Sequence, residues 1–182
     1  MNRAILLGAA LVLSLVVSGC CQRPEVAGAL VVNNTDKTVT VSVVEEPDGY
    51  GPWTIEPGLD ETVISAPGAR TLRFAVEGQP AQERKLDMTL EGLLLVPAKA
   101  DSCMALADHT DQYGGEGRVE VVAASSPQKP GVIKYLEGNY LGPEQPLPPD
   151  VLKGHKVARF TEVPCELMGD EKALHDHLWA LD

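Results

Sequence analysis

The chain has 182 residues, with 15 basic and 26 acidic side chains, a formal net charge of −11 and only two Trp, four Tyr and two Phe. The acidic balance argues against nucleic acid as a partner, because that binding depends on neutralising phosphates. The length suits one folded domain plus an appendage, and a hydrophobic content of 44% excludes a chain that is disordered throughout.

Residues 1–19 have the pattern of a secretory signal peptide. Arg3 precedes an apolar run from Ala4 to Val17, and no acidic residue occurs before Glu25. The run is too short to cross a bilayer, which takes about 20 apolar residues. We therefore expect residues 1–19 to direct export.

The end of this run carries a second motif, Val17-Ser18-Gly19-Cys20. It resembles the lipobox of bacterial lipoproteins, in which an aliphatic residue and two small residues precede a Cys. The resemblance implies cleavage before Cys20, a diacylglyceryl thioether on its sulfur and acylation of the new amino terminus. Several acyl chains, at about 0.8 kcal/mol per buried methylene, make a stable anchor. The alternative is an ordinary secreted protein that is cut elsewhere.

The resemblance also implies a place in the bacterial cell envelope. In lipoproteins of Gram-negative bacteria, Asp after the lipidated Cys retains the protein at the inner membrane. Cys21 stands there instead, which favours the periplasmic side of the outer membrane if the organism is Gram-negative. We expect a tether over residues 20–28 and a β-rich domain over residues 29–182.

The remaining cysteines follow from the compartment, because disulfides persist in exported proteins. With Cys20 lipidated and Cys21 on the tether, the simplest pair is Cys103 with Cys165. Closing this loop of about 60 residues would contribute roughly 3–4 kcal/mol in the chain-entropy model. Two buried free thiols are the alternative, and Cys21 is either idle or able to pair between molecules.

Alternating apolar and polar residues predict a series of short strands. Asx residues predict a hairpin between the first two strands, and Ala66-Pro67-Gly68-Ala69, typical of a type II turn, predicts a second hairpin. In the first half of the chain, the predicted strands are 29–32, 38–43, 61–65, 71–77, 85–90 and 93–96.

In the second half, the predicted strands are 102–109, 118–123, 132–136 and 156–163. Four prolines within residues 142–149 indicate an extended connection. Asp170 is a candidate N-cap for an amphipathic helix over 170–182. The order of elements predicts an all-β chain, an antiparallel β-sandwich or small barrel of about eight strands with a short C-terminal helix.

Tyr50 and Trp53 lie next to a loop rich in Gly and Pro. Exposed aromatic rings stack on sugars, so the two side chains are candidates for a small ligand-binding platform. Because the chain has few aromatic residues to fill a core, we favour the interpretation that Trp53 plugs one end of the sandwich.

Polar residues around His109 suggest two further hypotheses. Asp108 and Asp111 flank this His, as in a hydrolase, but no Gly-x-Ser-x-Gly motif surrounds any Ser. The same acids and Glu116 lie among glycines, where calcium can bind, yet their spacing differs from that of an EF-hand. We interpret the segment as a polar loop and predict neither catalytic residues nor a metal.

His175 and His177 lie two residues apart in the predicted helix. Side chains at this spacing point about 200° apart, whereas chelation on a helix needs a spacing of three or four. We therefore interpret this pair as part of an exposed helix.

These features predict an envelope lipoprotein held to the membrane by lipid, with a non-catalytic binding, assembly or structural role and no cofactor. Its other partner would be a second envelope protein or a cell-wall glycan. The alternative functions are a cell-wall or carbohydrate-binding module that uses Tyr50 and Trp53, and an envelope hydrolase around His109.

Overall fold

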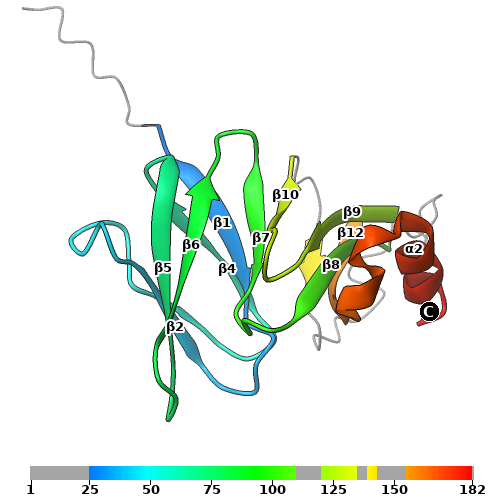
Figure 1. Ribbon diagram of the computed structural model, residues 1–182, viewed down its shortest axis with the longest axis horizontal. Helices are drawn as coiled ribbons and strands as arrows, with labels where there is room; N and C mark the ends of the chain where they lie inside the picture. The colour runs from blue at the N-terminus through cyan, green and yellow to red at the C-terminus, as the bar shows by residue number, and fades with distance from the viewer. Residues whose placement is uncertain (1–24, 110–119, 135–138, 143–154, 182) are drawn as a thin grey trace, which may run out of the picture.

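The computed structural model describes residues 25–109, 120–134, 139–142 and 155–181, and the structural statements below concern these residues. They form twelve strands, a 3-10 helix and an α-helix (Figure 1). The strands are β1 (Ala27–Val32), β2 (Val39–Val43), β3 (Trp53–Ile55), β4 (Asp60–Ser65), β5 (Gly68–Val76), β6 (Gln82–Met88), β7 (Leu93–Pro97), β8 (Cys103–Asp108), β9 (Glu120–Ser125), β10 (Gly131–Ile133), β11 (Asn139–Leu141) and β12 (Val157–Val163). The helices are η2 (Cys165–Gly169) and α2 (Glu171–Trp179).

The strands form three four-stranded sheets. We name them the central sheet (β10-β7-β1-β4), the β2 sheet (β3-β2-β5-β6) and the β8 sheet (β11-β12-β8-β9). The prediction of an all-β chain is confirmed, with twelve strands in place of about eight. Most pairs are antiparallel, but β1 pairs with β7 and β11 pairs with β12 in parallel.

The central sheet is covered on both faces, and β1 shows this directly because all six of its residues are buried. Alternate side chains of a strand point to opposite faces. Ala29 and Val31 belong to a cluster shared with the β2 sheet, which contributes Phe74. Leu30 and Val32 belong to a cluster shared with the β8 sheet. The continuous apolar run of β1 therefore reflects a strand between two layers.

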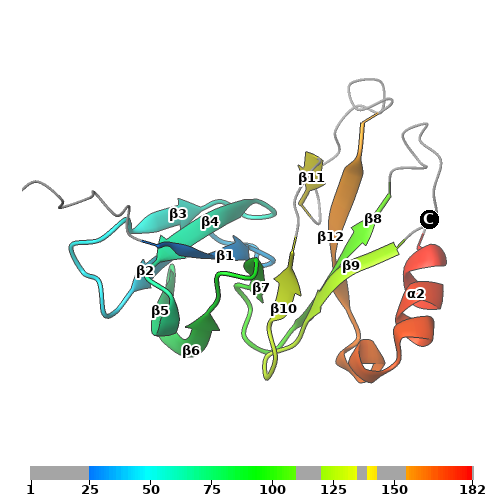
Figure 2. The same ribbon diagram turned by 90° about the horizontal axis from the view of Figure 1, so that it is seen from above.

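Helix α2 forms a fourth layer on the outer face of the β8 sheet (Figure 2). Leu174 and Leu178 are buried there against Ala105 and Ala107 of β8. The small alanine side chains allow a helix to lie close to the strand. Asp170 caps the helix as predicted, since its Oδ1 accepts a hydrogen bond of 2.9 Å from the backbone N–H of Ala173.

The two predicted hairpins in the first half are wrong. β1 pairs with β4 and β7, whereas β2 pairs with β3 and β5. β4 and β5 also lie in different sheets, so each turn carries the chain from one layer to the next. The alternation of apolar and polar residues does not distinguish a hairpin within one sheet from a connection between two sheets. In both arrangements the apolar side chains of the two strands point into one core.

Several boundaries differ from the expected ones. β1 begins at Ala27, within the segment assigned to the tether, and two short strands, β3 and β11, were not predicted. Their three residues are too few to display an alternating pattern. The predicted loop over 111–117 lies outside the described residues, as does the extended connection over 142–149 beyond Gly142.

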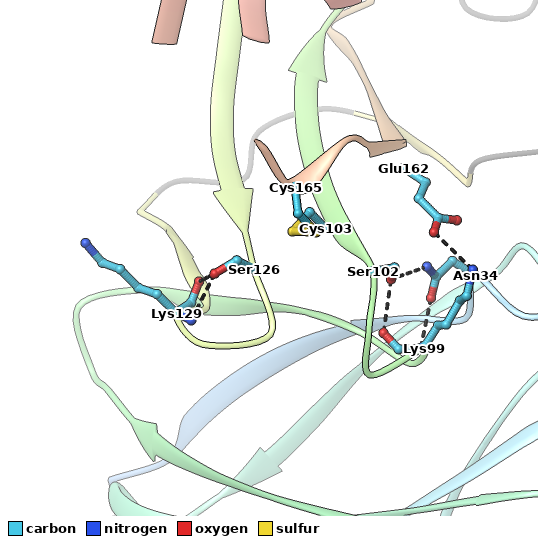
Figure 3. Close-up of a disulfide and its surroundings, with 8 residues drawn as sticks. All are labelled: Asn34, Lys99, Ser102, Cys103, Ser126, Lys129, Glu162 and Cys165. Atoms are coloured by element: carbon cyan, nitrogen blue, oxygen red, sulfur yellow. Dashed lines mark hydrogen bonds and ion pairs between the residues drawn. A yellow bond between two sulfur atoms is a disulfide. The ribbon is translucent and has the colours of Figure 1, made fainter. Parts of the chain in front are cut away.

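The predicted disulfide between Cys103 and Cys165 is confirmed, with a Cα–Cα distance of 5.1 Å (Figure 3). Cys103 is the first residue of β8 and Cys165 the first residue of η2. The bond therefore holds the segment that leads into α2 against the sheet that α2 covers. Cys20 and Cys21 lie outside the described residues.

Candidate functional site

Tyr50 and Trp53 line one pocket at the loop between β2 and β3, with a volume of about 350 Å³. The ring of Tyr50 is exposed, and Trp53 is half-buried at the start of β3, opposite Val41 of β2. The other residues of the pocket wall are Ser42, Val43, Val44, Glu46, Pro47, Gly51, Pro52 and Arg73. The structure thus brings the two predicted aromatic residues into one site.

The backbone of the loop lies close against the indole ring of Trp53. A Cβ atom on Gly51 would lie 2.5 Å from Cζ3 of Trp53, closer than carbon atoms approach, so only glycine fits there. The peptide bond between Gly51 and Pro52 is cis. The sequence Gly-Pro before Trp53 therefore shapes the wall of the pocket.

Two carboxylates hold the beginning of this loop against β5 and the turn before it. Glu46 accepts hydrogen bonds of 3.1 Å from the backbone N–H of Ala66 and from Nε of Arg70. Glu45 accepts bonds of 2.9 and 2.7 Å from the backbone N–H and the hydroxyl of Thr71. These bonds from Thr71 lower the pKa of Glu45. The loop is therefore tied to β5 on one side of the pocket.

The position of Trp53 is compatible with both interpretations considered for it, the core plug and the ligand-binding platform. It packs against the buried cluster between the central sheet and the β2 sheet, as expected for a ring that closes the end of a sandwich. It also lines the pocket together with Tyr50 and the charged side chains of Glu46 and Arg73. Aromatic faces beside hydrogen-bonding groups suit a ligand that is apolar on one face and polar at its edges.

His109 is buried at the end of β8, where its backbone N–H donates to the carbonyl of Val157 at 2.8 Å. Ser102 precedes the other end of β8, and Ser125 of β9 pairs with Met104 near that same end. At about 3.3 Å per residue, β8 separates Ser102 from His109 by more than 20 Å.

His109 therefore does not reach these serines. Ser126 follows Ser125 beyond the same end, so the hydrolase hypothesis finds no nucleophile among Ser102, Ser125 and Ser126. Asp111 and Glu116 lie outside the described residues.

The remaining candidates for metal binding do not form a site in the part of the chain that the structure describes. There, no three His, Cys, Asp or Glu side chains are arranged to hold a metal ion. The ring of His175 instead lies nearly parallel to that of Trp179, with 6.5 Å between ring centroids.

Among the described residues, no helix is both long enough and apolar enough to cross a membrane.

A larger cleft of about 590 Å³ lies at the opposite end of the sandwich and was missed by sequence reasoning. We call it the distal cleft. Its wall consists of Asn34, Thr35, Asp36, Phe74, Val76, Gln79, Gln82, Ala98, Lys99, Ala100 and Asp101. Three connecting segments meet there, so no single stretch of sequence marks it.

Arg84 closes the core beside the distal cleft. Its guanidinium lies 3.9 Å from the ring centroid of Phe74 and donates hydrogen bonds to the carbonyls of Pro97 and Ala98. Burial lowers the pKa of Arg84 to about 10. Arg84 was not singled out from the sequence; the signal that could have identified it is an Arg two residues before the buried Leu86, on the same face of β6.

A hydrogen-bonded group links the layers at the same end (Figure 3). Asn34 donates to the hydroxyl of Ser102 at 2.8 Å and accepts from the backbone N–H of Lys99 at 3.0 Å. Lys99 also forms an ion pair of 3.3 Å with Glu162 of β12. These contacts join the corner after β1 to the β8 sheet, next to the disulfide.

Comparison with protein-family models, curated proteins and solved structures found no match to this chain. Its function is therefore inferred from its own residues and their arrangement.

Proposed function

We propose that the chain is a bacterial envelope lipoprotein, anchored by lipid at Cys20, with a β domain that serves a non-catalytic binding or assembly role. The observation that carries the proposal is the position of the lipobox-like motif. It ends a short apolar run, and β1 begins at Ala27, the seventh residue after Cys20. An anchor at this position leaves the folded domain intact and holds it close to the membrane. In a Gram-negative organism, the domain would face the periplasm from the outer membrane.

The two adjacent cysteines provide a matched test of the anchor. We expect mass spectrometry of the mature protein to find acyl chains on Cys20 as the first residue. Cys20→Ala should move the protein from the membrane fraction to the soluble fraction or leave it unprocessed, whereas Cys21→Ala should leave the anchor in place. An unmodified amino terminus at another residue would refute the proposal, as would membrane association that is indifferent to Cys20→Ala.

A second candidate function is the binding of a cell-wall glycan or another carbohydrate. It is favoured by one observation, that Tyr50 and Trp53 line the same pocket. Aromatic rings pack on the C–H faces of sugar rings, and Glu46 and Arg73, which line the same pocket, are polar groups that suit the hydroxyls at the edge of a sugar.

Fluorescence can test this candidate, because the chain has only two Trp. In a Trp179→Phe protein, soluble peptidoglycan fragments should change the emission of Trp53, and Tyr50→Ala should weaken the response about tenfold, which corresponds to 1.4 kcal/mol. Tyr140→Phe, which alters a tyrosine of the β8 sheet, is the control. Emission that does not respond to the fragments would exclude glycan binding at this pocket.

A further inference from the structure

Four large apolar side chains are exposed where the chain enters the domain. They are Val26, Val44, Tyr50 and Leu90, which are 46, 45, 57 and 54% exposed. We call them the proximal rim. The opposite end of the same sandwich exposes only Leu59 among the large apolar residues that the structure describes, at 36%. The remaining exposed ones, Val122, Trp179 and Leu181, belong to β9 and the C-terminal helical segment.

Strand pairing places these residues at one end. Ala27, the first residue of β1, pairs with Ser65, the last residue of β4, so the turn after β4 lies beside the start of the domain. Gly68 begins β5 beyond that turn and pairs with Met88, the last residue of β6. Leu90 follows two residues later. Val26 and Leu90 consequently border one open depression of about 310 Å³.

The loop between β2 and β3 joins the same end through Glu46, which binds the backbone of Ala66 in the turn after β4. Val44 and Tyr50 belong to this loop and line its pocket. Figures 1 and 2 both show this loop and the start of β1 on the side of the molecule away from α2.

We propose that the proximal rim rests on the headgroup layer of the membrane, a role that depends on the lipid anchor proposed above. From Cys20 to Ala27 the chain spans at most about 25 Å when fully extended, so the rim stays near the bilayer. Tyr side chains are favoured at this depth, because the ring meets apolar chains and the hydroxyl meets water.

Charge decides which kind of membrane surface suits the rim. The exposed acids near it are Glu25, Glu45, Asp48 and Glu91. They outnumber the exposed bases Arg73, which lines the pocket of Tyr50, and Lys134, which shares the depression with Leu90. An anionic surface would repel these carboxylates within a Debye length of about 8 Å. Zwitterionic headgroups, which carry no net charge, are therefore the matching surface.

This orientation has a consequence for the distal cleft. The cleft contains Asp36 and Gln79, at the opposite end of the strands that lead to the rim. With the rim on the membrane, the cleft opens away from the bilayer and is accessible to a soluble partner.

The two Trp residues report on the orientation. The lipidated full chain would be reconstituted in phosphatidylcholine vesicles that carry bromine on the acyl chains, which quenches nearby indoles. Trp179→Phe leaves Trp53 beside the rim, and Trp53→Phe leaves Trp179 on α2. We expect about twofold stronger quenching of Trp53 than of Trp179, since only the rim enters the headgroup layer. Thermal unfolding of both variants confirms that they are folded.

A matched pair of surface substitutions tests the contact itself. Leu90→Asp, on the Trp179→Phe background, should remove most of the quenching of Trp53, whereas Leu59→Asp at the opposite end should not alter it. Replacing part of the phosphatidylcholine by phosphatidylglycerol should reduce the quenching.

The failures are distinguishable. A protein without acyl mass that does not bind vesicles would remove both the anchor and the rim contact. A vesicle-bound protein with equal quenching of both Trp residues, or quenching that Leu90→Asp leaves unchanged, would overturn the rim contact and leave the anchor. A dimer in detergent that Leu90→Asp dissociates, without quenching of Trp53 in vesicles, would assign the rim to a second copy and overturn the proposal.

Discussion

Arg84 and Phe74 form a cation–π pair at the distal end of the sandwich, with the guanidinium carbon 3.9 Å from the ring centroid. Arg84 pairs with Leu72 across β5 and β6, and it lies on the face of β6 that also carries the buried Leu86 and Met88. A charged side chain thus stands where the alternation calls for an apolar one. Its guanidinium donates hydrogen bonds to the carbonyls of Pro97 and Ala98, so these two acceptors at the end of β7 have partners.

We predict that Arg84→Met lowers the free energy of unfolding by about 2 kcal/mol. The methionine keeps the apolar stem but removes the cation–π contact and the charged hydrogen bonds to two carbonyls. Urea unfolding would measure the change. Lys85→Met, on the exposed face of the same strand, is the control and should change stability by less than about 0.5 kcal/mol. Equal effects of the two substitutions would contradict the structural role of Arg84.

The disulfide between Cys103 and Cys165 should stabilise the C-terminal layer most. We predict that the double substitution of both cysteines by Ala lowers the free energy of unfolding by roughly 4 kcal/mol in the chain-entropy model. Because Cys165 begins the segment leading to α2, amide hydrogen exchange should rise first in α2. Exchange that rises first in β2 or β5 would show that the bond does not secure this layer.

Asn33 should be essential for the corner between β1 and β2. It is fully buried, and its side-chain amide donates to the carbonyls of Lys37 and Ile55, each at 2.8 Å. Its Oδ1 accepts from the backbone N–H and the hydroxyl of Thr35 at 3.1 and 2.7 Å. Asn33→Ala leaves these partners unpaired, and we expect a loss of about 2–3 kcal/mol in a thermal or urea unfolding experiment.

Asp36→Ala is the control for this corner, because Asp36 is exposed in the same turn. It should cost less than about 0.5 kcal/mol. An equal loss for Asp36→Ala would indicate that the turn, rather than the Asn33 amide, limits stability.

Tyr140 should titrate at unusually high pH. Burial raises the pKa of Tyr140 to about 12, and the negative charge of Asp60 adds to the shift. Both effects disfavour the phenolate. We predict that Asp60→Asn lowers the pKa of Tyr140 but leaves it above the ordinary value near 10, because burial is the larger cause. NMR of the tyrosine Cζ carbons across pH 9–12 would follow this group.

Asp60→Asn should also change the pH dependence of the stability of the domain. Burial is the larger cause that raises the pKa of Asp60 above its ordinary value, and the charge of Glu61 adds to it. The carboxyl group of Asp60 therefore binds a proton more tightly in the folded state than in the unfolded chain. The stability that this binding provides is present below the unfolded pKa near 4 and is lost as pH rises through the higher pKa of the folded state. We expect Asp60→Asn to raise the melting temperature at pH 7 relative to the wild-type chain, with a smaller change at pH 3. An unchanged difference across this range would contradict the shift.

Much of the local structure was determined by sequence alone. The alternation of Leu72 and Phe74 with polar neighbours identified a half-buried strand, and Asp170 with Leu174 and Leu178 identified a capped helix that packs on one side. These patterns are local because they follow from the geometry of a single strand or helix. The disulfide was also predictable, since Cys103 and Cys165 were the two cysteines left after the amino-terminal pair was assigned.

The tertiary structure alone decided how the strands combine. The alternating pattern predicts that Val31 and Val41 face a core. It does not predict whether their strands pair within one sheet or pack against each other from two sheets, because both arrangements bury the same side chains. The close packing of Gly51 on Trp53, the distal cleft and the exposure of Tyr50 and Leu90 at one end of the sandwich all involve residues from separate turns. Their positions depend on which strands pair, and that choice is made by packing over the whole domain.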